Sequence, residues 1–510
     1  MQGCYKLHVL NLMVHVLQAS SVLQTGWHCV QSSPALKGGV TATIAFQARY
    51  VAQMQDMRHE TQDSNDWPLL FIPIIPPMSS TIHLSLEIPV KYRAEICVIG
   101  AGPSGVAAAV SAARLGKKVI LLDANTFPGG LSTAARVPVL MPYSDGHRIL
   151  MKGFGEDFLQ RLGTRGPLEA EHVKRVFDAM LGEAGVDVLY GCHFFVADCE
   201  NGKIRSACFQ SISGNFAVEA GLFIAASGDG ALAVAVGCEY VVGGEAGETM
   251  PPTLCSLWTG FDWEAYRAGG AFSHNDENML EKLSAAFASG ELSTLDWHHT
   301  GMTRLTPQLA GANIGHVFDV DVMDEQSVSQ ALVTARQQLV EYEAFYQKHI
   351  AGFEHACIAA SGSMLGIRET RRILGEYVLC REDYLARRSF VDEIGRYNFP
   401  ADIHPAHPTR EMLEEHKRCF RGEGYKAGES YGIPYRSLIP RHTVNLLICG
   451  RCISCDRYVF ASVRVIPGCF ISGQAAGFAA ALCVEKKCSP KELDPNQLRA
   501  AMAEHQALLQ

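Results

Sequence analysis

Three glycines and one aspartate have the residue types and the spacing of a dinucleotide-binding site. Gly100, Gly102 and Gly105 form a GxGxxG motif, and Asp123 lies eighteen residues after the last glycine. In such a motif the first glycine permits a tight turn, the second lets the backbone approach a pyrophosphate, and the third lets a helix pack on a strand. A carboxylate at this distance binds ribose hydroxyls. The predicted cofactor-binding loop comprises Gly100, Ala101, Gly102, Pro103, Ser104 and Gly105.

Two arginines are the first candidates for chemistry on a substrate. Arg368 and Arg372 are four residues apart, so they share one face of a helix, and their even spacing also places them on one face of a strand. Two guanidinium groups together suit a carboxylate or another anionic group. The alternative is a solvated or salt-bridged basic face, because Glu369 and Glu376 are close in the sequence.

A histidine and a group of cysteines are further candidates. His404 has a side chain that transfers protons near neutral pH, although loop histidines are often structural. Cys449, Cys452 and Cys455 have CxxCxxC spacing, which is typical of part of an iron–sulfur ligand run or of a redox dithiol. Against both interpretations, Cys449 belongs to an apolar run that predicts a buried strand. We therefore predict no metal site.

A buried strand and a helix must position the glycine loop. The apolar run EICVIG before it is typical of a parallel strand that is buried on both faces. An alanine-rich helix is predicted from Pro103 to about Gly116, with its first amides directed at the phosphates. A second buried strand, KVILLD, ends at Asp123. This context supports dinucleotide binding more strongly than the glycines alone, because glycine loops also serve as plain turns.

Further motifs continue the pattern along the chain. GGLST begins at Gly129, six residues after the predicted ribose-binding aspartate. The dipeptide NG at residues 201–202 separates two apolar runs and favours a type I′ hairpin. The run GLFIAA leads into SGD at residues 227–229. Near the C-terminus, NLLICG predicts a strand and GCFISGQAAGFAAALC predicts a helix with small residues for tight packing.

With these motifs, residues 87–482 resemble the FAD-dependent oxidoreductase family. The resemblance is to flavoproteins of the two-dinucleotide-binding-domain type. These are related in fold to fumarate-reductase and glutathione-reductase flavoproteins. The resemblance implies an α/β fold with a Rossmann-like FAD-binding domain, made of a parallel sheet plus a β-meander, and an inserted α+β cap or substrate domain. It implies FAD as the cofactor and hydride transfer between bound flavin and a small organic substrate, anionic if the arginines bind it. Two alternatives stay open, an NAD(P)-dependent Rossmann dehydrogenase and a non-catalytic flavin-binding protein.

The resemblance also assigns cofactor-binding residues beyond the first loop. They are Asp123, Gly129, Gly130, Leu131, Ser132, Gly228, Asp229, Gly450, Arg451, Gly473 and Gln474. Gly450 and Arg451 are expected to approach the ribityl chain, although many members have Gly-Asp where this chain has Gly-Arg and its nearest acid is Asp456. The helix that contains Gly473 and Gln474 is expected to direct its N-terminus, and hence its dipole, at the flavin.

Three more candidate catalytic residues follow from the resemblance. Tyr435 and Arg436 lie just before the last predicted strand of the FAD-binding domain, which is expected to bring them near the flavin. Cys452 matches a family position that is expected to line the flavin site.

Four segments are predicted along the chain. They are a poorly structured N-terminal extension (1–85), the first part of the FAD-binding domain (86–260), the cap or substrate domain (261–429) and the C-terminal part of the FAD-binding domain (430–510). The extension shows no apolar periodicity, and Met78 lies just before the ordered pattern begins. We expect residues 1–77 to be dispensable for folding and FAD binding.

Composition narrows the choice of partners. The 510 residues are 48% hydrophobic and carry a formal net charge of -9, with no basic tract of the kind that binds nucleic acid. The 17 scattered cysteines predict reduced thiols and a cytoplasmic location. No apolar run is expected to span a membrane. The expected partners are a small-molecule substrate and an electron acceptor of unspecified kind, and no signal indicates an oligomeric state.

Overall fold

The computed structural model describes most of the chain after the predicted extension. The described residues are 81–508, apart from 246, 270–276, 297–301, 408, 410, 412–413 and 415–423. They belong to one compact unit that contains residues 72–510. The predicted extension lies outside the described residues up to residue 80, and the predicted boundaries of the other segments stay predictions.

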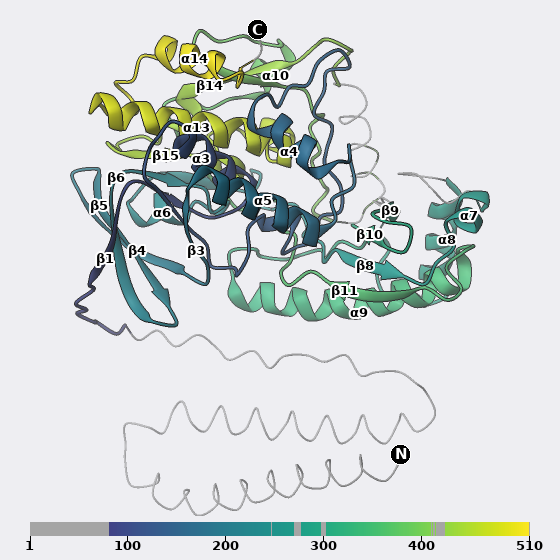
Figure 1. Cartoon of the computed structure of the whole chain (residues 1–510). Helices are drawn as coiled ribbons and strands as arrows, with labels where there is room; N and C mark the ends of the chain where they lie inside the picture. The colour runs from purple at the N-terminus through teal and green to yellow at the C-terminus, as the bar shows by residue number, and fades with distance from the viewer. Residues whose placement is uncertain are drawn as a thin grey trace, which may run out of the picture. The chain divides into compact units, whose positions relative to one another are not determined.

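A mixed sheet that contains the predicted nucleotide-binding strands is the centre of this unit (Figure 1). Its strands, in spatial order, are β3 (Asp187–Leu189), β2 (Val119–Leu122), β1 (Val90–Ile99), β6 (Gly214–Ala225), β5 (Lys203–Ser211) and β4 (His193–Glu200), and β15 (Leu446–Ile448) also pairs with β6. The pairs β3–β2, β2–β1, β1–β6 and β6–β15 are parallel, whereas β6, β5 and β4 form an antiparallel meander. The predicted α/β fold with a parallel sheet plus a β-meander is confirmed.

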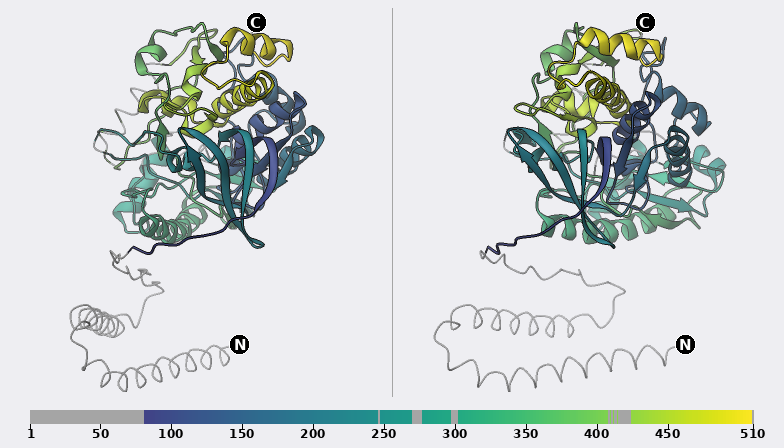
Figure 2. Two further views of the ribbon diagram at one scale, coloured as in Figure 1. Left: turned by 90° about the vertical axis from the view of Figure 1, so that its left-hand side faces the viewer. Right: turned by 60° about the vertical axis from the view of Figure 1, so that its left-hand side comes forward.

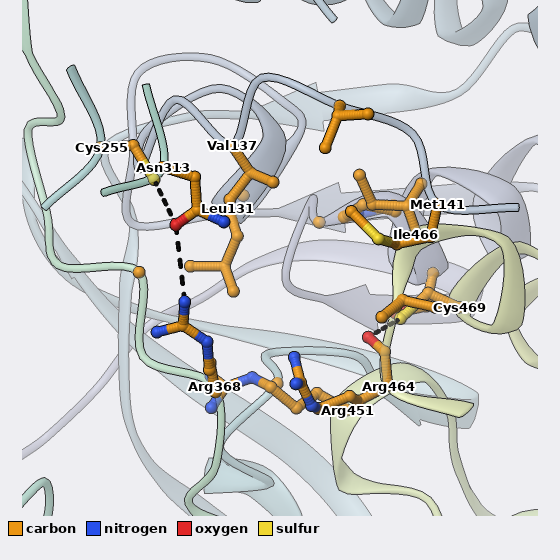
Figure 3. A pocket seen from close by; sticks show the side chains of 18 of the residues that line it. Leu131, Val137, Met141, Cys255, Asn313, Arg368, Arg451, Arg464, Ile466 and Cys469 are labelled. Atoms are coloured by element: carbon orange, nitrogen blue, oxygen red, sulfur yellow. Dashed lines mark hydrogen bonds between the residues drawn. The ribbon is translucent and has the colours of Figure 1, made fainter. Parts of the chain in front are cut away.

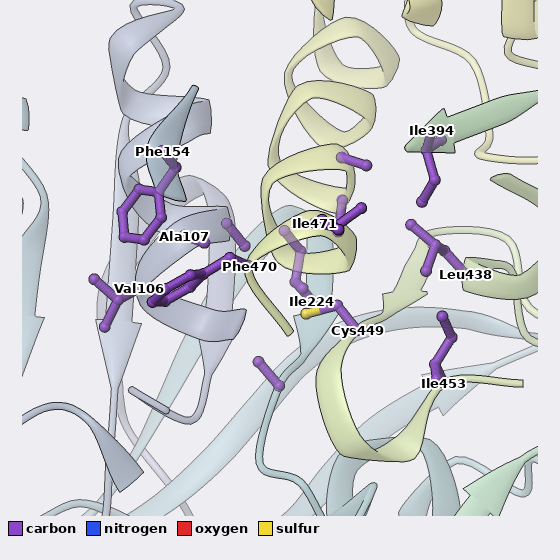
Figure 4. Close-up of a cluster of buried hydrophobic side chains, with 14 of the residues drawn as sticks. Val106, Ala107, Phe154, Ile224, Ile394, Leu438, Cys449, Ile453, Phe470 and Ile471 are labelled. Atoms are coloured by element: carbon purple, nitrogen blue, oxygen red, sulfur yellow. The ribbon is translucent and has the colours of Figure 1, made fainter. Parts of the chain in front are cut away.

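The apolar run of β1 is continuous because both faces of the strand are covered. Ile96 and Val98 join the core cluster that includes the helices α3 (Pro103–Arg114) and α13 (Ile466–Lys486). Cys97 and Ile99 point the other way, into a second cluster with residues of β5 and β6. Full burial of one aliphatic side chain stabilises a fold by about 1.5–3 kcal/mol. Figure 4 shows part of the first cluster, where Phe154 and Phe470 pack with ring centroids 5.2 Å apart.

Helices α3 and α13 pack closely against each other because glycines remove side chains from their interface. A Cβ atom on Gly473 would collide with the backbone of Ser104, and one on Gly477 would collide with the backbone of Ala108. Helix α13 is also long and apolar enough to cross a membrane by length and composition, contrary to the expectation from the sequence. Because 89% of its apolar window is buried, packing in the protein core accounts for its composition.

The β4–β5 hairpin confirms the turn predicted at residues 201–202. Asn201 and Gly202 both have positive φ angles, 52° and 74°, as a two-residue type I′ turn requires. The long strands of this meander are seen beside β1 in both views of Figure 2.

A second, four-stranded sheet has three strands in the segment predicted as the cap, and its fourth strand, β8 (Ser256–Thr259), precedes the predicted start of that segment at residue 261. Its order is β11 (Cys357–Ser361), β8, β10 (Ala310–Ala312) and β9 (Met302–Arg304). It is accompanied by α7 (Trp263–Ala268), α8 (Glu277–Ala288) and the long helix α9 (Glu325–His349), which runs beneath the sheet in Figure 1. Their shared core includes Trp258 and Tyr346, whose ring centroids are 5.4 Å apart.

Shorter elements complete the described chain. The helices are α4 (Phe154–Leu162), α5 (Ala170–Ala184), α6 (Ala231–Ala235), α10 (Arg381–Leu385), α12 (Arg457–Val463) and α14 (Pro495–Glu504). Two antiparallel ribbons pair β7 (Tyr240–Val242) with β12 (Arg371–Ile373) and β13 (Glu393–Tyr397) with β14 (Tyr431–Pro434). Short 3-10 turns are η2 (Gly130–Ser132), η3 (Tyr435–Leu438) and η4 (Gly450–Cys452).

Candidate functional site

A cavity of about 560 Å³ lies where parallel strands of the main sheet end. Gly100 follows β1, Asp123 follows β2 and Ala226 follows β6, and all three residues line the cavity. Ligands of open α/β sheets bind outside the carboxyl ends of the strands, and small-molecule sites have volumes of roughly 300–1,000 Å³. The position and the size of the cavity therefore suit a nucleotide cofactor with a small substrate beside it.

The glycine-lined part of the cavity, defined by Gly100, Gly102, Asp123 and Gly130, provides a cradle for phosphate. A Cβ atom built on Gly102 would meet no atom within 4 Å, so a side chain at this position would occupy the cavity itself. Helix α3 begins here, and no side chain caps its N-terminus. Uncapped amides and the helix dipole attract an anion. These features fit the pyrophosphate of a dinucleotide.

Asp123 holds this cradle together. One carboxylate oxygen accepts a hydrogen bond from the Ala101 backbone N–H at 2.5 Å, and the other accepts from the backbone and the side chain of Asn125 at 2.7 and 2.9 Å. The Ala101 carbonyl in turn accepts from the Gly129 N–H at 2.7 Å. The predicted ribose-binding carboxylate therefore faces the cavity while it also connects two cofactor-binding loops.

The predicted cofactor-binding residues divide into two groups. Those that line the cavity are Gly100, Gly102, Pro103, Ser104, Asp123, Gly130, Leu131, Gly228, Asp229 and Arg451. Those outside its lining are Ala101, Gly105, Gly129, Ser132, Gly450, Gly473 and Gln474. The second group supports the site from behind through turns and close packing.

Gln474 is a clear example of that difference. Its side-chain carbonyl accepts from the Phe154 N–H at 2.7 Å, and its amide donates to the Ala507 carbonyl at 2.9 Å. The amide therefore joins α13 to neighbouring segments and does not face a ligand. The cavity is lined instead by the N-terminal part of α13, where Ile466 and Cys469 are found and where no side chain caps the helix.

Arg451 occupies the position where many members of the resembling family have an aspartate. Its guanidinium donates to the Asp229 carboxylate at 2.6 Å and to the Thr370 hydroxyl at 3.2 Å. The two cavity-lining charges therefore form an ion pair between the ends of β15 and β6. Asp456, the nearest acid in the sequence, instead caps α12 by accepting from the Val459 N–H at 2.8 Å.

Arg368 faces the cavity as a buried cation that has only neutral partners. Its guanidinium donates to the Pro251 carbonyl at 2.7 Å, to the Thr253 hydroxyl at 3.0 Å and to the Asn313 side chain at 3.5 Å. Among the described residues no carboxylate forms a salt bridge with it. Burial lowers the pKa of Arg368 to about 10, which still leaves it charged at neutral pH. A buried charge of this kind calls for an anionic partner.

Arg372 does not share the site with Arg368, so the predicted arginine pair is wrong. Arg372 lies in β12, and its guanidinium binds Glu369 and the Gly243 carbonyl away from the cavity lining. Both Arg372 and Glu369 are buried. For this residue the alternative of a salt bridge, which the sequence left open, describes the structure.

Tyr435 and Arg436 also lie outside the cavity lining. The Tyr435 hydroxyl donates to the Pro490 carbonyl at 2.9 Å, and Arg436 forms an ion pair with Asp392 at 3.0 Å. Both residues belong to η3, which precedes β15 in the chain. Their placement shows that closeness to a cofactor-binding strand in sequence does not place a side chain at its cofactor end.

The cysteines of the CxxCxxC run are buried thiols. Burial raises the pKa of Cys452 to about 12, and its Sγ lies against the Ala225 and Cys449 carbonyls outside the cavity lining. Cys449 packs in the apolar cluster shown in Figure 4. All described cysteines are free, and no cluster among the described residues could hold a metal. Cys469 does line the cavity, as a thiol whose Sγ donates to the Arg464 carbonyl at 3.1 Å.

His404 lies at the cavity, but both of its ring nitrogens are already bonded. Nδ1 lies 2.8 Å from Nε2 of His316, and Nε2 lies 3.1 Å from the Asp402 carboxylate. Nδ1 of His316 lies 2.9 Å from Asp296. The four side chains form one hydrogen-bonded chain that begins at the cavity lining, where Asp402 and His404 are found.

Sequence reasoning missed several residues of the arginine-lined part, defined by Arg368, Asp402, His404, Arg464 and Asn313. Arg464 is buried, with its pKa lowered by desolvation, and it donates to the Asp402 carbonyl at 3.1 Å. Figure 3 shows Arg368, Arg451 and Arg464 along one side of the cavity. The apolar side chains Leu131, Val137, Met141 and Ile466 lie across from them. The sequence signal that could have identified Arg464 is its position shortly before the predicted helix that begins near Gly468.

Comparisons with known proteins extend over most of the chain. The model of the family described as "FAD dependent oxidoreductase" matches residues 95–502. A segment of 70 residues is 40% identical to the sarcosine oxidase subunit alpha of Rhizobium meliloti (strain 1021), and this match covers 12% of the chain and 7% of that subunit.

Two solved structures are similar at lower identity. A geranylgeranyl bacteriochlorophyll reductase-like protein from Thermoplasma acidophilum is 14% identical with a TM-score of 0.40, over 82% of this chain and 84% of that chain. The p-nitrophenol 4-monooxygenase of Pseudomonas putida DLL-E4 is 12% identical with a TM-score of 0.41, over 82% and 87% of the two chains.

Proposed function

The chain belongs to the FAD-dependent oxidoreductase family, with FAD as its cofactor, and we propose that it transfers hydride between FAD and a small organic anion. The family match decides in favour of FAD over a nicotinamide nucleotide, which a GxGxxG motif alone leaves open. The substrate class is the new part of the proposal, and it depends on the chemistry of the cavity.

The glycine-lined part supplies the groups that would hold FAD. Gly102 leaves room for the pyrophosphate, the amides at the start of α3 would donate to it, and Asp123 would accept from a ribose. The uncapped start of α13 adds a second positive helix end at the same cavity. When bound, FAD supplies the hydride acceptor or donor.

The observation that carries the substrate class is the buried charge of Arg368. This guanidinium faces the cavity with neutral partners only, while Arg451 and Arg464 beside it are paired with Asp229 and Asp402. An anionic group of the substrate would complete the charge balance and would be oriented by two N–H donors. Leu131 and Met141, across the cavity, would cover the apolar part of the substrate and exclude water. A small carboxylate fits this combination.

The cysteines and the cavity also support proposals for the compartment of the enzyme and for the size of its substrate. The described cysteines are free and many are buried with raised pKa values, which supports a reducing compartment such as the cytoplasm. We expect a small-molecule substrate rather than a macromolecule, because the volume of the cavity, about 560 Å³, is in the range of small-molecule sites.

Anaerobic reduction of the FAD-loaded enzyme by a substrate panel tests the proposal. The panel contains α-hydroxy, α-amino and N-methylamino carboxylates, with sarcosine included because a short segment resembles a sarcosine oxidase subunit. Each acid is paired with its neutral amide as a matched control. We expect loss of the visible flavin absorbance with an acid and not with its amide. Bleaching by the amides alone would refute the anionic substrate, and protein that neither retains nor takes up FAD would refute the cofactor site.

A further inference from the structure

We propose that Cys483 and Cys488 form an oxidisable dithiol, a modification site that a peroxide converts into an intramolecular disulfide. The two cysteines lie at the C-terminal end of α13, the helix whose first residues line the cavity. Four residues separate them in the sequence, and both are free thiols in the structure. This site goes beyond the proposed function, because it lies at the end of α13 that is away from the cavity.

The way in which α13 ends brings the two side chains together. Lys487 has a left-handed conformation, with φ 55° and ψ 40°, and the Cys488 N–H donates to the Cys483 carbonyl at 3.1 Å. These features define a Schellman motif, in which the side chains at these two positions commonly pack against each other. Burial raises the pKa of Cys483, and the neighbouring Cys488 thiol raises it further, which is the effect of a close second sulfur. Contact between two cysteine side chains is the starting geometry for a disulfide, whose Cβ atoms lie about 3.5–4.5 Å apart.

The two thiols differ in their exposure to solvent. Cys483 is 2% exposed and belongs to the main core cluster, whereas Cys488 is partly exposed and packs against that cluster. A dissolved oxidant therefore meets Cys488 first, and Cys483 lies behind it to attack the oxidised sulfur. Cys449, Cys452 and Cys455 are each at most 1% exposed, so an oxidant in solution does not reach the CxxCxxC run in the same way.

The chain that follows Cys488 is fixed by hydrogen bonds. The backbone N–H and the hydroxyl of Ser489 donate to the Glu492 carboxylate at 2.9 and 2.8 Å. The Tyr435 hydroxyl donates to the Pro490 carbonyl at 2.9 Å. These contacts keep the second cysteine beside the end of the helix. Reaction of one sulfur with the other is therefore favoured over reaction with a thiol in solution, because the two sulfurs have a high effective concentration.

The proposed modification is a two-electron oxidation in two steps. The Cys488 sulfur, as the thiolate, attacks one oxygen of hydrogen peroxide, the O–O bond breaks, and the leaving hydroxide takes the released proton as water, so that Cys488 carries a sulfenic acid. The Cys483 sulfur then attacks Sγ of Cys488. The S–S bond forms, the S–O bond breaks, and hydroxide leaves with the Cys483 proton as a second water. The two thiols lose two electrons and two protons, and the peroxide is reduced to two waters.

The disulfide is compatible with bound FAD. Cys483 lies fourteen residues after the cavity-lining Cys469 on α13, which is about 21 Å along the helix axis. The cross-link closes a turn that the Cys488 N–H already closes with a hydrogen bond, so α13 keeps its place against the sheet. We therefore expect the oxidised enzyme to retain its FAD.

Peptide mass spectrometry of the FAD-loaded full-length enzyme, treated with hydrogen peroxide, tests the site. Trypsin cleaves after Lys486 and Lys487, between the two cysteines, so the disulfide yields a cross-linked pair of peptides. We expect this pair to form, to disappear on treatment with dithiothreitol, and to leave the visible absorbance of bound FAD unchanged. Cys357, an exposed thiol of β11, is the control for reaction with the oxidant. Oxidation of Cys357 without the cross-linked pair would overturn the proposal, and release of FAD as the pair forms would refute its compatibility with the cofactor.

Two variants separate the roles of the two sulfurs. In Cys483→Ser, Cys488 should stop at the sulfenic acid, which dimedone traps, and glutathione disulfide should leave a stable adduct on it. In the wild type that adduct should be roughly 100-fold less abundant, because Cys483 is held in place to displace the glutathione. Cys488→Ser should leave Cys483 unmodified, since it is buried. Equal adducts in the wild type and Cys483→Ser would show that the sulfurs do not join. The absorbance of FAD reports whether each variant folds, and the wild-type peptides decide the question without either variant.

Discussion

The glycine-lined and arginine-lined parts of the cavity are built in different ways. The glycine-lined part comes from neighbouring loops of one strand–helix–strand unit, and backbone groups do most of its work. The arginine-lined part brings together side chains such as Asn313, Arg368, His404 and Arg464, which are far apart in the sequence. Local chain geometry is sufficient to form a phosphate cradle, whereas a substrate site needs charges that are delivered from several segments.

The two parts should also respond differently to mutation. A side chain added at Gly102 in the glycine-lined part reduces the space that is available to FAD and meets no protein atom within 4 Å. A substitution such as Arg368→Ala in the arginine-lined part removes a charge whose burial costs desolvation free energy. Measurements of FAD binding and of substrate binding should therefore separate the two parts.

Gly102→Val should produce the largest functional effect. A Cβ at this position meets no protein atom within 4 Å, so the variant should fold normally while its side chain occupies the phosphate cradle. We expect FAD affinity to fall by at least 100-fold, on the order of 3 kcal/mol, when measured by equilibrium dialysis. Gly182→Val is the control, because Gly182 is exposed on α5 and its Cβ is equally unobstructed. Normal FAD content in purified Gly102→Val would show that the glycine-lined part does not bind the phosphates of FAD.

Arg368→Ala should weaken binding of a carboxylate substrate and leave FAD bound. Loss of a charged hydrogen bond costs about 1.5–3 kcal/mol, which corresponds to roughly 10- to 150-fold in the half-saturation of flavin reduction. Arg368→Lys should recover part of this loss, because an ammonium group does not make the two-point contact. Arg436→Ala is the matched control, since Arg436 is paired with Asp392 outside the cavity lining. Equal effects of Arg368→Ala and Arg436→Ala would show that the charge at the cavity does not select the substrate.

Asp123→Asn should have a moderate effect that is confined to FAD. The amide keeps one acceptor oxygen, but it loses the charge and one of the contacts that join Ala101 to Asn125. We expect FAD affinity to fall by about 10-fold, consistent with about 0.5–1.5 kcal/mol for one hydrogen bond. The half-saturation for substrate in FAD-saturated enzyme should stay unchanged. A selective loss of substrate affinity would show that the two parts of the cavity are not separable.

Cys452→Ser should have a small effect in both parts. The thiol is buried outside the cavity lining and its pKa is raised to about 12, so it carries no charge for either cofactor or substrate. We expect the rate of flavin reduction to stay within about 2-fold and the free energy of unfolding to fall by about 1 kcal/mol, because a buried hydroxyl replaces an apolar thiol. If Cys452→Ser abolished flavin reduction while its stability stayed at the wild-type value, Cys452 would have a redox role.

The smallest effect is expected far from both parts, at Glu291. Hydrogen bonds from His349 and Lys348 lower the pKa of Glu291 from 4.5 to about 2. Because the folded-state pKa is the lower one, the stabilisation by the carboxylate is complete above about pH 4.5 and is lost as the pH falls toward 2. The difference in Tm between wild type and Glu291→Gln should therefore be small at neutral pH and should shrink in acid. A difference that grows in acid would contradict this sign.

Sequence reasoning succeeded where a local pattern has a local consequence. The order of strand, glycine loop, helix and strand up to Asp123 was predicted, and so were the turn at Asn201 and the helix that contains Gly473. It failed at Arg372, whose four-residue spacing from Arg368 suggested a shared face. The segment is not a regular helix or strand over both residues, so one guanidinium faces the cavity and the other is buried against Glu369.

By itself the sequence determined the nucleotide-binding unit, because glycine conformations, apolar periodicity and helix starts act over a few residues. Tertiary structure alone decided which charged side chains meet at the cavity. Asp296, His316 and Asp402 lie in three separate segments, and no local pattern records that folding will place them within hydrogen-bond reach of one another through His404. Such contacts depend on how sheets and loops pack over long sequence distances, and this packing joins the aspartates and histidines into one hydrogen-bonded chain at the cavity.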